Sequence, residues 1–331
     1  MKVAIVKLSA LGDIVHAMVG LQFIKAQVPL IEIDWVVEER YAEILKYNPD
    51  INNVLTVDLK SLKRQRSGIF KQIKKIRRYA DHEYDLVIDA QGLIKSAITA
   101  RLLGNHIAGF DAHSIREKSA AWLYDVKISC AYDENTIDRN AMVLSKPLGF
   151  TISREQIGNK KPFLFFSEND DGWHECFVKD GVNIIFVIGS TWPSRNYPAE
   201  KFVKIAEALQ ENCLVVWGSE QEKALADWMA LQSRHIRVVP RMDLNNLKAL
   251  IAKADLLIGN DTGPTHMAWG LNRPSITIFG PTPVSRVYQT DINKVVKSPS
   301  DVNPLKLNKQ DYSIKEIDER DIIDMAMLLL P

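Results

Sequence analysis

Short apolar segments alternate with amphipathic segments along this chain, and this alternation constrains the fold more than any other feature of the sequence. In the first half, apolar segments at 3–8, 33–37, 54–57 and 86–89 alternate with helically spaced segments at 12–26, 69–79 and 93–103. Strands that are apolar nearly throughout are typical of parallel sheets, whose crossover helices cover both faces. The pattern therefore predicts a doubly wound α/β domain.

The same pattern starts again after residues 151–182, which are rich in polar residues and show no clear period. Apolar segments at 183–188, 214–217, 256–258 and 275–279 alternate with helical segments at 200–210, 220–231, 244–254 and 264–271, and a last helical segment spans 314–330. A length of 331 residues also fits two domains. We expect a second doubly wound domain, with ligands bound in a cleft at the carboxyl ends of the strands.

The composition argues against several classes of protein. Lys and Arg total 42 against 41 Asp and Glu, and this net charge of +1 gives no support to a nucleic-acid partner. No apolar segment reaches the about 20 residues of a membrane span, and Lys7, Asp13 and His16 interrupt the apolar N-terminus, so we expect no signal peptide. The three cysteines form no CxxC pair and no HExxH motif occurs, which predicts neither a disulfide framework nor a catalytic metal.

The loop KLSALGD at 7–13 directly follows the first apolar segment. Gly12 permits a tight turn there. Asp13 lies at the start of the following helix, where a carboxylate can cap the helix and is stabilised by the helix dipole. A carboxylate in this position can instead project into the cleft as a general base. The loop matches neither GxGxxG nor the P-loop pattern, so the sequence predicts neither a dinucleotide fingerprint nor a P-loop.

Two later loops suit a diphosphate. NDTGPTH at 260–266 follows a strand and opens a helix, whose first N–H groups form a site for an anion, with Asp261 or Thr262 as the cap and His266 one turn further on. GSTWPSRNYP at 189–198 places hydroxyl groups and Arg195 after another strand, and arginine binds phosphate oxygens in a bidentate manner. A solvated loop is the alternative interpretation of this second motif.

Nine lysines and arginines gather between residues 60 and 78. Such a run is usually a solvated face, but it can also attract an anionic lipid surface, a polyanionic substrate or nucleic acid. Few aromatic residues lie between these charges, which argues against stacking on nucleic-acid bases.

Together these motifs resemble those of the bacterial lipopolysaccharide heptosyltransferases, glycosyltransferase family nine. The resemblance runs through nearly the whole chain. It comprises VKLSALGDIVH at 6–16, DWVVEE at 34–39, VIDAQGLIKSA at 87–97, WGSEQE at 217–222, and GNDTGPTHMAWGL with RPSITIFGPT between 259 and 282. DWVVEE and DAQGLIKSA favour the branch of the family that adds the first heptose of the inner core.

The resemblance implies a GT-B architecture with two Rossmann-like domains facing across a cleft. The first, 1–160, would bind the acceptor, the second, 161–313, would bind the nucleotide sugar, and the last segment, 314–331, would return to the first domain. The implied reaction is an inverting transfer of L-glycero-D-manno-heptose from ADP-heptose to the 3-deoxy-D-manno-octulosonic acid (Kdo) of Kdo-lipid A. It needs no metal or other cofactor, and we expect a monomer bound peripherally at the cytoplasmic face of the inner membrane.

The resemblance also assigns site residues. Asp13 matches the catalytic base of the family, and Arg195 occupies a position where the family commonly has lysine, which keeps the charge but changes its reach. The donor-binding residues are Ser190, Thr191, Arg195, Glu222, Met242, Asp261, Thr262, Gly263 and His266. The acceptor-binding residues are Lys7, Ser9, Lys60, Lys63, Arg64, Arg66, Arg116 and Arg139. Asp89, Gln91 and Lys95 can line the acceptor cleft, although Asp89 can equally well cap its helix.

Three alternatives stay open. A related family member would use another sugar or acceptor, as does the enzyme that adds the second heptose, and its donor loops would look similar. A nucleotide-sugar 2-epimerase on the same fold would need a second acid–base set around the sugar and would leave the basic run unexplained. A non-enzymatic binder of anionic lipid or nucleic acid would not need Asp13.

Overall fold

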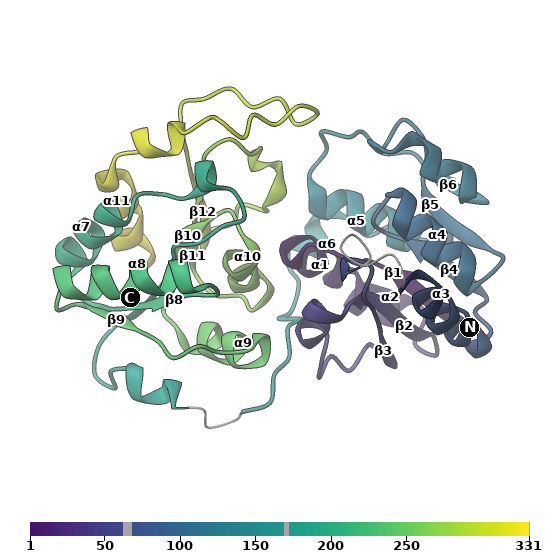
Figure 1. The fold of residues 1–331 in the computed structure, drawn as a ribbon, viewed down its shortest axis with the longest axis horizontal. Coiled ribbons are helices and arrows are strands. Elements are labelled where there is room, and N and C mark those ends of the chain that lie inside the picture. The colour runs from purple at the N-terminus through teal and green to yellow at the C-terminus, as the bar shows by residue number, and fades with distance from the viewer. Residues whose placement is uncertain (62–67, 169–171, 331) are drawn as a thin grey trace. The chain divides into compact units, whose positions relative to one another are not determined.

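The computed structural model of the chain describes residues 1–61, 68–168 and 172–330. It divides into two compact units, Met1–Phe165 and the part that begins at Phe166, whereas the sequence placed the division after residue 160. Within these described residues, each unit holds one six-stranded sheet whose neighbouring strands are all parallel (Figure 1). This confirms the doubly wound architecture that the alternating pattern predicts.

In the first unit the strands lie in the order β3-β2-β1-β4-β5-β6. Their bounds are β1 Lys2–Val6, β2 Glu32–Glu38, β3 Asn53–Val57, β4 Leu86–Asp89, β5 Ile107–Phe110 and β6 Val126–Ile128. The helices are α1 Leu11–Met18, α2 Gly20–Gln27, α3 Ile69–Tyr79, α4 Ile94–Leu103, α5 Thr136–Ser145 and α6 Arg154–Gly158. The segment 12–26, expected as one helix, is therefore two helices that meet at Val19.

In the second unit the order is β12-β11-β10-β7-β8-β9. The strands are β7 Asn183–Val187, β8 Asn212–Val216, β9 Ile236–Val238, β10 Leu256–Asn260, β11 Ser275–Phe279 and β12 Asn293–Lys297. The helices are α7 Ala199–Leu209, α8 Glu220–Gln232, α9 Leu244–Lys253, α10 Gly263–Gly270 and α11 Glu319–Leu329. All residues of β7, β8, β10 and β11 are buried, as expected of strands covered on both faces.

Each sheet contains one point where the order of its strands reverses. This point lies between β1 and β4 in the first unit and between β7 and β10 in the second. Ligands of doubly wound sheets bind at such points, outside the carboxyl ends of the strands. The loops that follow Val6, Asp89, Val187 and Asn260 are therefore the places where each unit is expected to build its site.

The last helix belongs to the second unit, which corrects the expectation that residues 314–331 return to the first domain. Ile322 and Ala326 of α11 are buried in the hydrophobic core that also holds Phe202 of α7. Glu319 at the start of α11 forms ion pairs with Lys201 and Lys204 of α7, with N–O distances of 3.4 and 2.6 Å. The apolar face of α11 is thus covered by the second sheet and its neighbouring helix.

No helix in the parts of the chain that the structure describes is both long and apolar enough to cross a membrane.

The packing of α11 can be tested by truncating its buried anchor. Ile322 is fully buried, so we expect Ile322→Ala to lower the free energy of unfolding by about 2–5 kcal/mol through lost burial and the cavity left behind. Leu328→Ala on the same helix, where the side chain is 85% exposed, should change it by less than about 0.5 kcal/mol. Urea unfolding of both variants measures the difference. Equal losses would contradict the observed orientation of α11.

Candidate functional site

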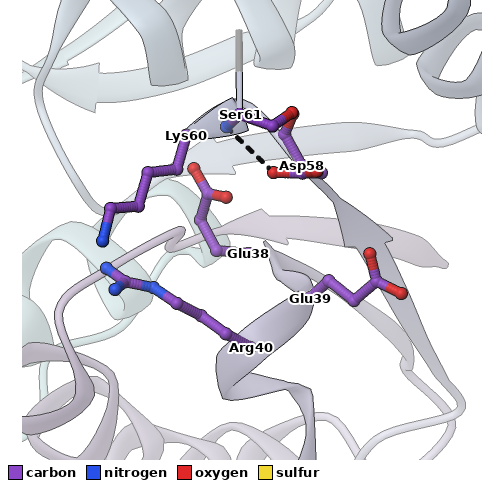
Figure 2. Close-up of a pocket in the computed structure, with 6 residues that line it drawn as sticks. All are labelled: Glu38, Glu39, Arg40, Asp58, Lys60 and Ser61. Atoms are coloured by element: carbon purple, nitrogen blue, oxygen red, sulfur yellow. Dashed lines mark hydrogen bonds between the residues drawn. The ribbon is translucent and has the colours of Figure 1, made fainter. Parts of the chain in front are cut away.

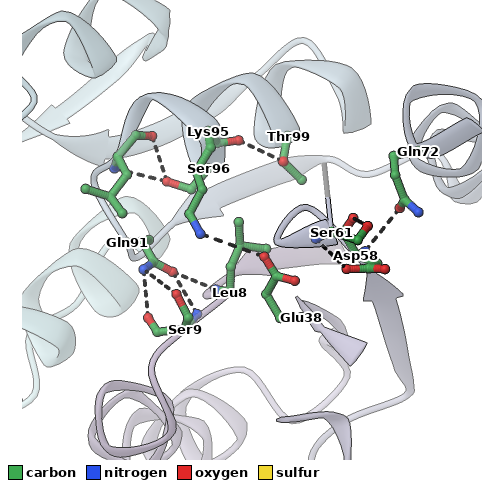
Figure 3. Close-up of polar contacts among 11 residues, drawn as sticks. Leu8, Ser9, Glu38, Asp58, Ser61, Gln72, Gln91, Lys95, Ser96 and Thr99 are labelled. Carbon is green, nitrogen blue, oxygen red and sulfur yellow. Dashed lines mark hydrogen bonds and ion pairs between the residues drawn. The ribbon is translucent and has the colours of Figure 1, made fainter. Parts of the chain in front are cut away.

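The loop after β1 is held by a side chain from the loop after β4. The amide oxygen of Gln91 accepts hydrogen bonds from the backbone N–H groups of Leu8 (2.7 Å) and Ser9 (3.1 Å). Its amide nitrogen donates to the carbonyl oxygen of Ser9 at 2.7 Å. Figure 3 shows this two-way contact between the loops at the strand-order reversal. Gln91 therefore fixes the backbone that leads into α1.

Asp13 lies in the first turn of α1 and is half-buried. Its Oδ2 accepts a hydrogen bond from the backbone N–H of Ala10 at 3.1 Å. The capping contact expected at this position is thus present. It orients the carboxylate at the carboxyl end of β1, where a general base would also have to lie.

Asp89, the last residue of β4, is fully buried. Its carboxylate accepts hydrogen bonds from Tyr124 Oη (2.6 Å), Ser96 Oγ (2.8 Å) and the backbone N–H of Gln91 (2.9 Å). Burial raises the pKa of this carboxyl group, and the hydrogen bonds offset only part of the effect. Asp89 therefore joins the loop, α4 and Tyr124 in the interior and does not line a cleft.

The ring of Tyr124 reaches Asp89 only because β5 has a glycine beneath it. A Cβ atom at Gly109 would lie 2.5 Å from the Tyr124 ring. The glycine thus leaves the space that the ring fills on its way to the buried carboxylate.

Two of the expected acceptor cations are engaged inside the first unit. The Lys7 ammonium is buried and donates to the carbonyl oxygen of Ala90 (2.7 Å) and to Oδ1 of Asn140 (3.0 Å). Burial lowers the pKa of Lys7, while the carboxylates of Asp13 and Asp89 counteract this shift. Lys7 thus lies beneath the loop that carries Asp13.

The Arg139 guanidinium donates to the carbonyl oxygens of Ser114 (2.6 Å) and Cys130 (3.3 Å) and lies over the ring of Phe110. These contacts give Arg139 a structural role at the end of β5. Arg116 is exposed and Ser9 is half-buried. Lys63, Arg64 and Arg66 lie outside the described residues.

A pocket of about 400 Å³ opens at the carboxyl ends of β2 and β3. Figure 2 shows the side chains that line it: Glu38, Glu39, Arg40, Asp58, Lys60 and Ser61. Lys60, an expected acceptor residue, is exposed at this pocket. Lys95 reaches from α4 to Glu38 with an N–O distance of 3.8 Å, as Figure 3 shows. The pocket therefore combines both signs of charge next to the Gln91–Ser9 contact.

In the second unit, the loops after β7 and β10 meet in a buried ion cluster. Oδ2 of Asp261 lies 2.9 Å from a terminal nitrogen of Arg195, and its Oδ1 lies 3.0 Å from Nε2 of His266. Thr282 Oγ1 donates to Oδ2 of Asp261 at 2.7 Å. Burial acts to raise the pKa of Asp261, but Arg195, His266 and Arg286 outweigh it and hold this pKa well below its usual range.

The other expected donor residues lie in loops that follow strands of the same sheet. Thr262 is the N-cap residue of α10, and Gly263 is its first residue, so that the free N–H groups of α10 begin directly after Asp261. Ser190 Oγ donates to the carbonyl oxygen of Trp192 at 2.8 Å, and Thr191 is exposed. Met242 is half-buried in the loop before α9.

Glu222 lies against the loop after β7. A Cβ atom at Gly189 would come within 2.1 Å of Oε1 of Glu222, so only glycine leaves room for this carboxylate. Oε2 of Glu222 accepts a hydrogen bond from the backbone N–H of Gly218 at 2.6 Å. The ends of β7 and β8 are thus brought together around Glu222.

The sequence did not single out Thr282 or Arg286 as site residues. Both follow β11 and act on Asp261, Thr282 by a hydrogen bond and Arg286 by its charge. Their position at the carboxyl end of a strand beside β10 was the available signal, because loops at this edge converge on the same site.

Within the described ranges, no group of three or more His, Cys, Asp or Glu side chains is arranged to hold a metal ion.

Comparison with known proteins gives a consistent result. A family model described as glycosyltransferase family 9 (heptosyltransferase) matches residues 69–311. Lipopolysaccharide heptosyltransferase 1 of Campylobacter coli is 34% identical to this chain, with 98% of each chain covered. The protein of the same name from Escherichia coli (strain K12) is 29% identical, with 94% of this chain and 97% of the relative covered. The structure of E. coli heptosyltransferase WaaC with ADP-2-deoxy-2-fluoro heptose has a TM-score of 0.80 at 24% identity, with 99% of each chain covered, and shows the shared fold.

The ion cluster predicts a pH-dependent stability. Arg195→Met would leave Asp261 with less compensation for its burial, so we expect the free energy of unfolding at neutral pH to fall by about 3–5 kcal/mol. The depressed pKa of Asp261 stabilises the fold above the usual carboxyl pKa, and this contribution is lost as the pH falls towards the folded-state pKa. Asp261 has a higher pKa in the variant than in the wild type. The difference in free energy of unfolding between the two proteins should therefore become smaller below about pH 4.

Urea unfolding at several pH values measures this difference. Lys223→Met, which removes an exposed ion pair with Asp227 in the same unit, is the matched control and should cost at most about 1 kcal/mol. The double variant Asp261→Asn, Arg195→Met should be more stable than Arg195→Met alone, because no buried carboxylate is left. A loss of unfolding free energy that does not depend on pH, or that equals the loss in the control, would contradict the stabilising role of the Arg195–Asp261 pair.

Proposed function

The chain belongs to glycosyltransferase family 9, the heptosyltransferase family, and we propose that it transfers L-glycero-D-manno-heptose from ADP-heptose to the Kdo residue of Kdo-lipid A. The observation that carries this proposal is the match to lipopolysaccharide heptosyltransferase 1 over 98% of both chains. The family membership, together with DWVVEE and DAQGLIKSA in the first unit, supports this enzyme over a 2-epimerase or a non-enzymatic binder. Because the proposed acceptor is a lipid, we propose that the protein acts as a peripheral enzyme at the cytoplasmic face of the inner membrane.

The donor residues suit a nucleotide diphosphate sugar. In the proposed complex, the N–H groups at the start of α10 and the hydroxyl groups of Ser190, Thr191 and Thr262 bind the diphosphate. Arg195 forms an ion pair with Asp261, and Arg286 adds its positive charge to the surroundings of this carboxylate. In the proposed complex, these two guanidinium groups stabilise the negative charge that grows on the departing ADP. Glu222 and Met242 bind the ribose and adenine, and Asp261 and His266 contact the heptose or the phosphates.

The proposed reaction is a single displacement. The Asp13 carboxylate accepts the proton of the attacking Kdo hydroxyl group while its oxygen forms a bond to the anomeric carbon of the heptose. The bond from that carbon to the phosphate oxygen breaks on the opposite face, ADP leaves with the bonding electron pair, and the anomeric configuration inverts. Gln91 and Ala10 hold the loop and the carboxylate in place for this step.

The acceptor is proposed to lie along the first unit. Lys60 and the pocket beside it are exposed to a ligand, and Arg116, Lys63, Arg64 and Arg66 complete the cationic set in this proposal. Lys7 and Arg139 contribute as positioning residues, because their cationic groups are engaged by the protein itself. Ser9 contributes through the backbone that Gln91 holds.

A transfer assay tests the function directly. The purified protein is mixed with ADP-heptose and de-acylated Kdo-lipid A in the presence of EDTA, and ADP release and product mass are measured. We expect the acceptor to gain the mass of one heptose residue at the same rate with and without the chelator. Donor binding without transfer would point to another acceptor, and the absence of donor binding would point to another nucleotide sugar.

The role of Asp13 can be separated from its capping contact. Both Asp13→Ala and Asp13→Asn should lower kcat by about 10²–10⁴-fold while ADP-heptose still binds, because neither side chain accepts the proton. The amide introduced by Asp13→Asn keeps an oxygen that can accept the Ala10 N–H hydrogen bond, so recovery of activity in this variant alone would reveal a cap and no base. Asp81→Asn, at an exposed aspartate of the same unit, is the control and should leave kcat unchanged.

A further inference from the structure

Three helical segments of the first unit lie side by side. The 3₁₀ helix η5 (Lys118–Leu123) packs against α4. Residues that flank η5 contact α4 near both of its ends. At one end the backbone N–H of Ile94 donates to Glu117 at 2.7 Å, and at the other Arg101 pairs with Asp125 at 3.3 Å. α3 packs against α4 as well. α3 and η5 are therefore both neighbours of α4, and we name the exposed residues of these three segments the α3–α4 face.

The α3–α4 face exposes large apolar side chains. Trp122 of η5 is 81% exposed, Phe70 of α3 is 79% exposed, and Ile98 of α4 is 49% exposed. Ile94 lies one turn before Ile98 on the same side of α4 and is also exposed. Exposing a tryptophan and a phenylalanine costs free energy in water, and large exposed apolar side chains on neighbouring segments are typical of an interaction surface.

Cationic side chains are exposed on the same segments. Exposed lysines and arginines on the same segments are Lys71, Lys74, Arg77, Arg78 and Lys118. The nearby carboxylates of Glu117 and Asp125 are engaged by the Ile94 N–H and by Arg101. The α3–α4 face therefore combines large exposed apolar side chains with exposed positive charges.

We propose that the α3–α4 face docks on an anionic lipid bilayer, with Trp122 and Phe70 entering the headgroup region. Tryptophan favours this interface, where its ring is buried and its N–H group stays hydrated. The flanking lysines and arginines attract anionic headgroups, and each of them adds to the affinity. A second copy of the chain is a poor occupant, because a two-fold contact would bring the same cations together.

The face lies next to the proposed catalytic loop. α4 begins three residues after Gln91, which holds the backbone before Asp13, and Lys95 reaches Glu38 at the pocket. Docking would thus place the Asp13 loop near the membrane surface. This last step rests on the proposed function, whereas membrane binding by the face does not.

Vesicle co-sedimentation of the full chain tests the proposal without any activity measurement. We expect binding to vesicles of phosphatidylethanolamine with a minority of phosphatidylglycerol and none to phosphatidylcholine vesicles. Phe70→Ser with Trp122→Ser should weaken binding about tenfold or more through lost insertion. Lys74→Gln with Arg78→Gln should weaken it and reduce its dependence on salt. Circular dichroism verifies that the variants stay folded.

Matched controls lie elsewhere on the chain. Leu30→Ser removes a side chain that is 90% exposed in the same unit, and Lys179→Gln with Lys306→Gln removes two exposed charges of the second unit. Neither control should change vesicle binding. If vesicle binding depended only on overall hydrophobicity or net charge, the controls and the test variants would lose the same amount of binding. That result would overturn the proposal.

Insertion is measured separately with brominated lipids, which quench tryptophan emission on contact. We expect quenching in the wild type that Trp122→Phe abolishes and that Trp228→Phe, at a partly exposed tryptophan of the second unit, preserves. Unquenched Trp122 would overturn the proposal.

Two other results would also overturn it. One is a dimer in light scattering that dissociates when Phe70→Ser and Trp122→Ser are introduced. The other is binding to duplex DNA in preference to vesicles. Loss of vesicle binding in a variant that still transfers heptose to the soluble acceptor would separate docking from the reaction.

Discussion

Each sheet must accommodate a buried carboxylate next to the point where its strand order reverses, and the two units do so by opposite means. Asp89 ends β4, and its hydrogen-bond partners are neutral donors, which offset only part of the rise in pKa that burial causes. Asp261 follows β10 and is surrounded by cationic groups, so its pKa is lowered. An unpaired carboxylate is costly to bury, and these partners therefore determine how the loops around each site pack. In the first unit the result is a hydrogen-bonded scaffold behind Asp13 that also holds the Lys7 ammonium, and in the second it is an ion cluster beside the start of α10.

The alternating pattern was sufficient to predict the fold and many of the elements. α3, β4 and β11 have the bounds expected of them, because their apolar residues are regularly spaced and their ends are marked by polar residues. β5, β6, β9 and β12 were not predicted. β6 and β9 have only three residues each, and β12 begins and ends with polar residues at the edge of its sheet. Their strand conformation depends on pairing with a neighbour that the local sequence does not reveal.

The site could be predicted at the level of loops, and less well at the level of side chains. Motif position was enough to place Asp13, Arg195, Asp261 and Thr262 at the carboxyl ends of central strands. Nothing in the sequence indicated that Arg195 and Asp261 form an ion pair, since they come from loops 66 residues apart whose approach depends on the neighbouring positions of β7 and β10. Nor does the sequence separate a buried lysine from an exposed one. Lys7 lies in the interior and Lys60 at the surface because of the strand and loop they follow.

The contact between Gly109, Tyr124 and Asp89 has a consequence for how such sequences diverge. A larger residue at 109 would displace the tyrosine ring, and the displaced ring would leave the buried aspartate without one of its donors. A substitution at any one of these positions is therefore expected to destabilise the fold unless the others change with it. We therefore expect residues 89, 109 and 124 to be substituted together, and not one at a time, among descendants of this protein.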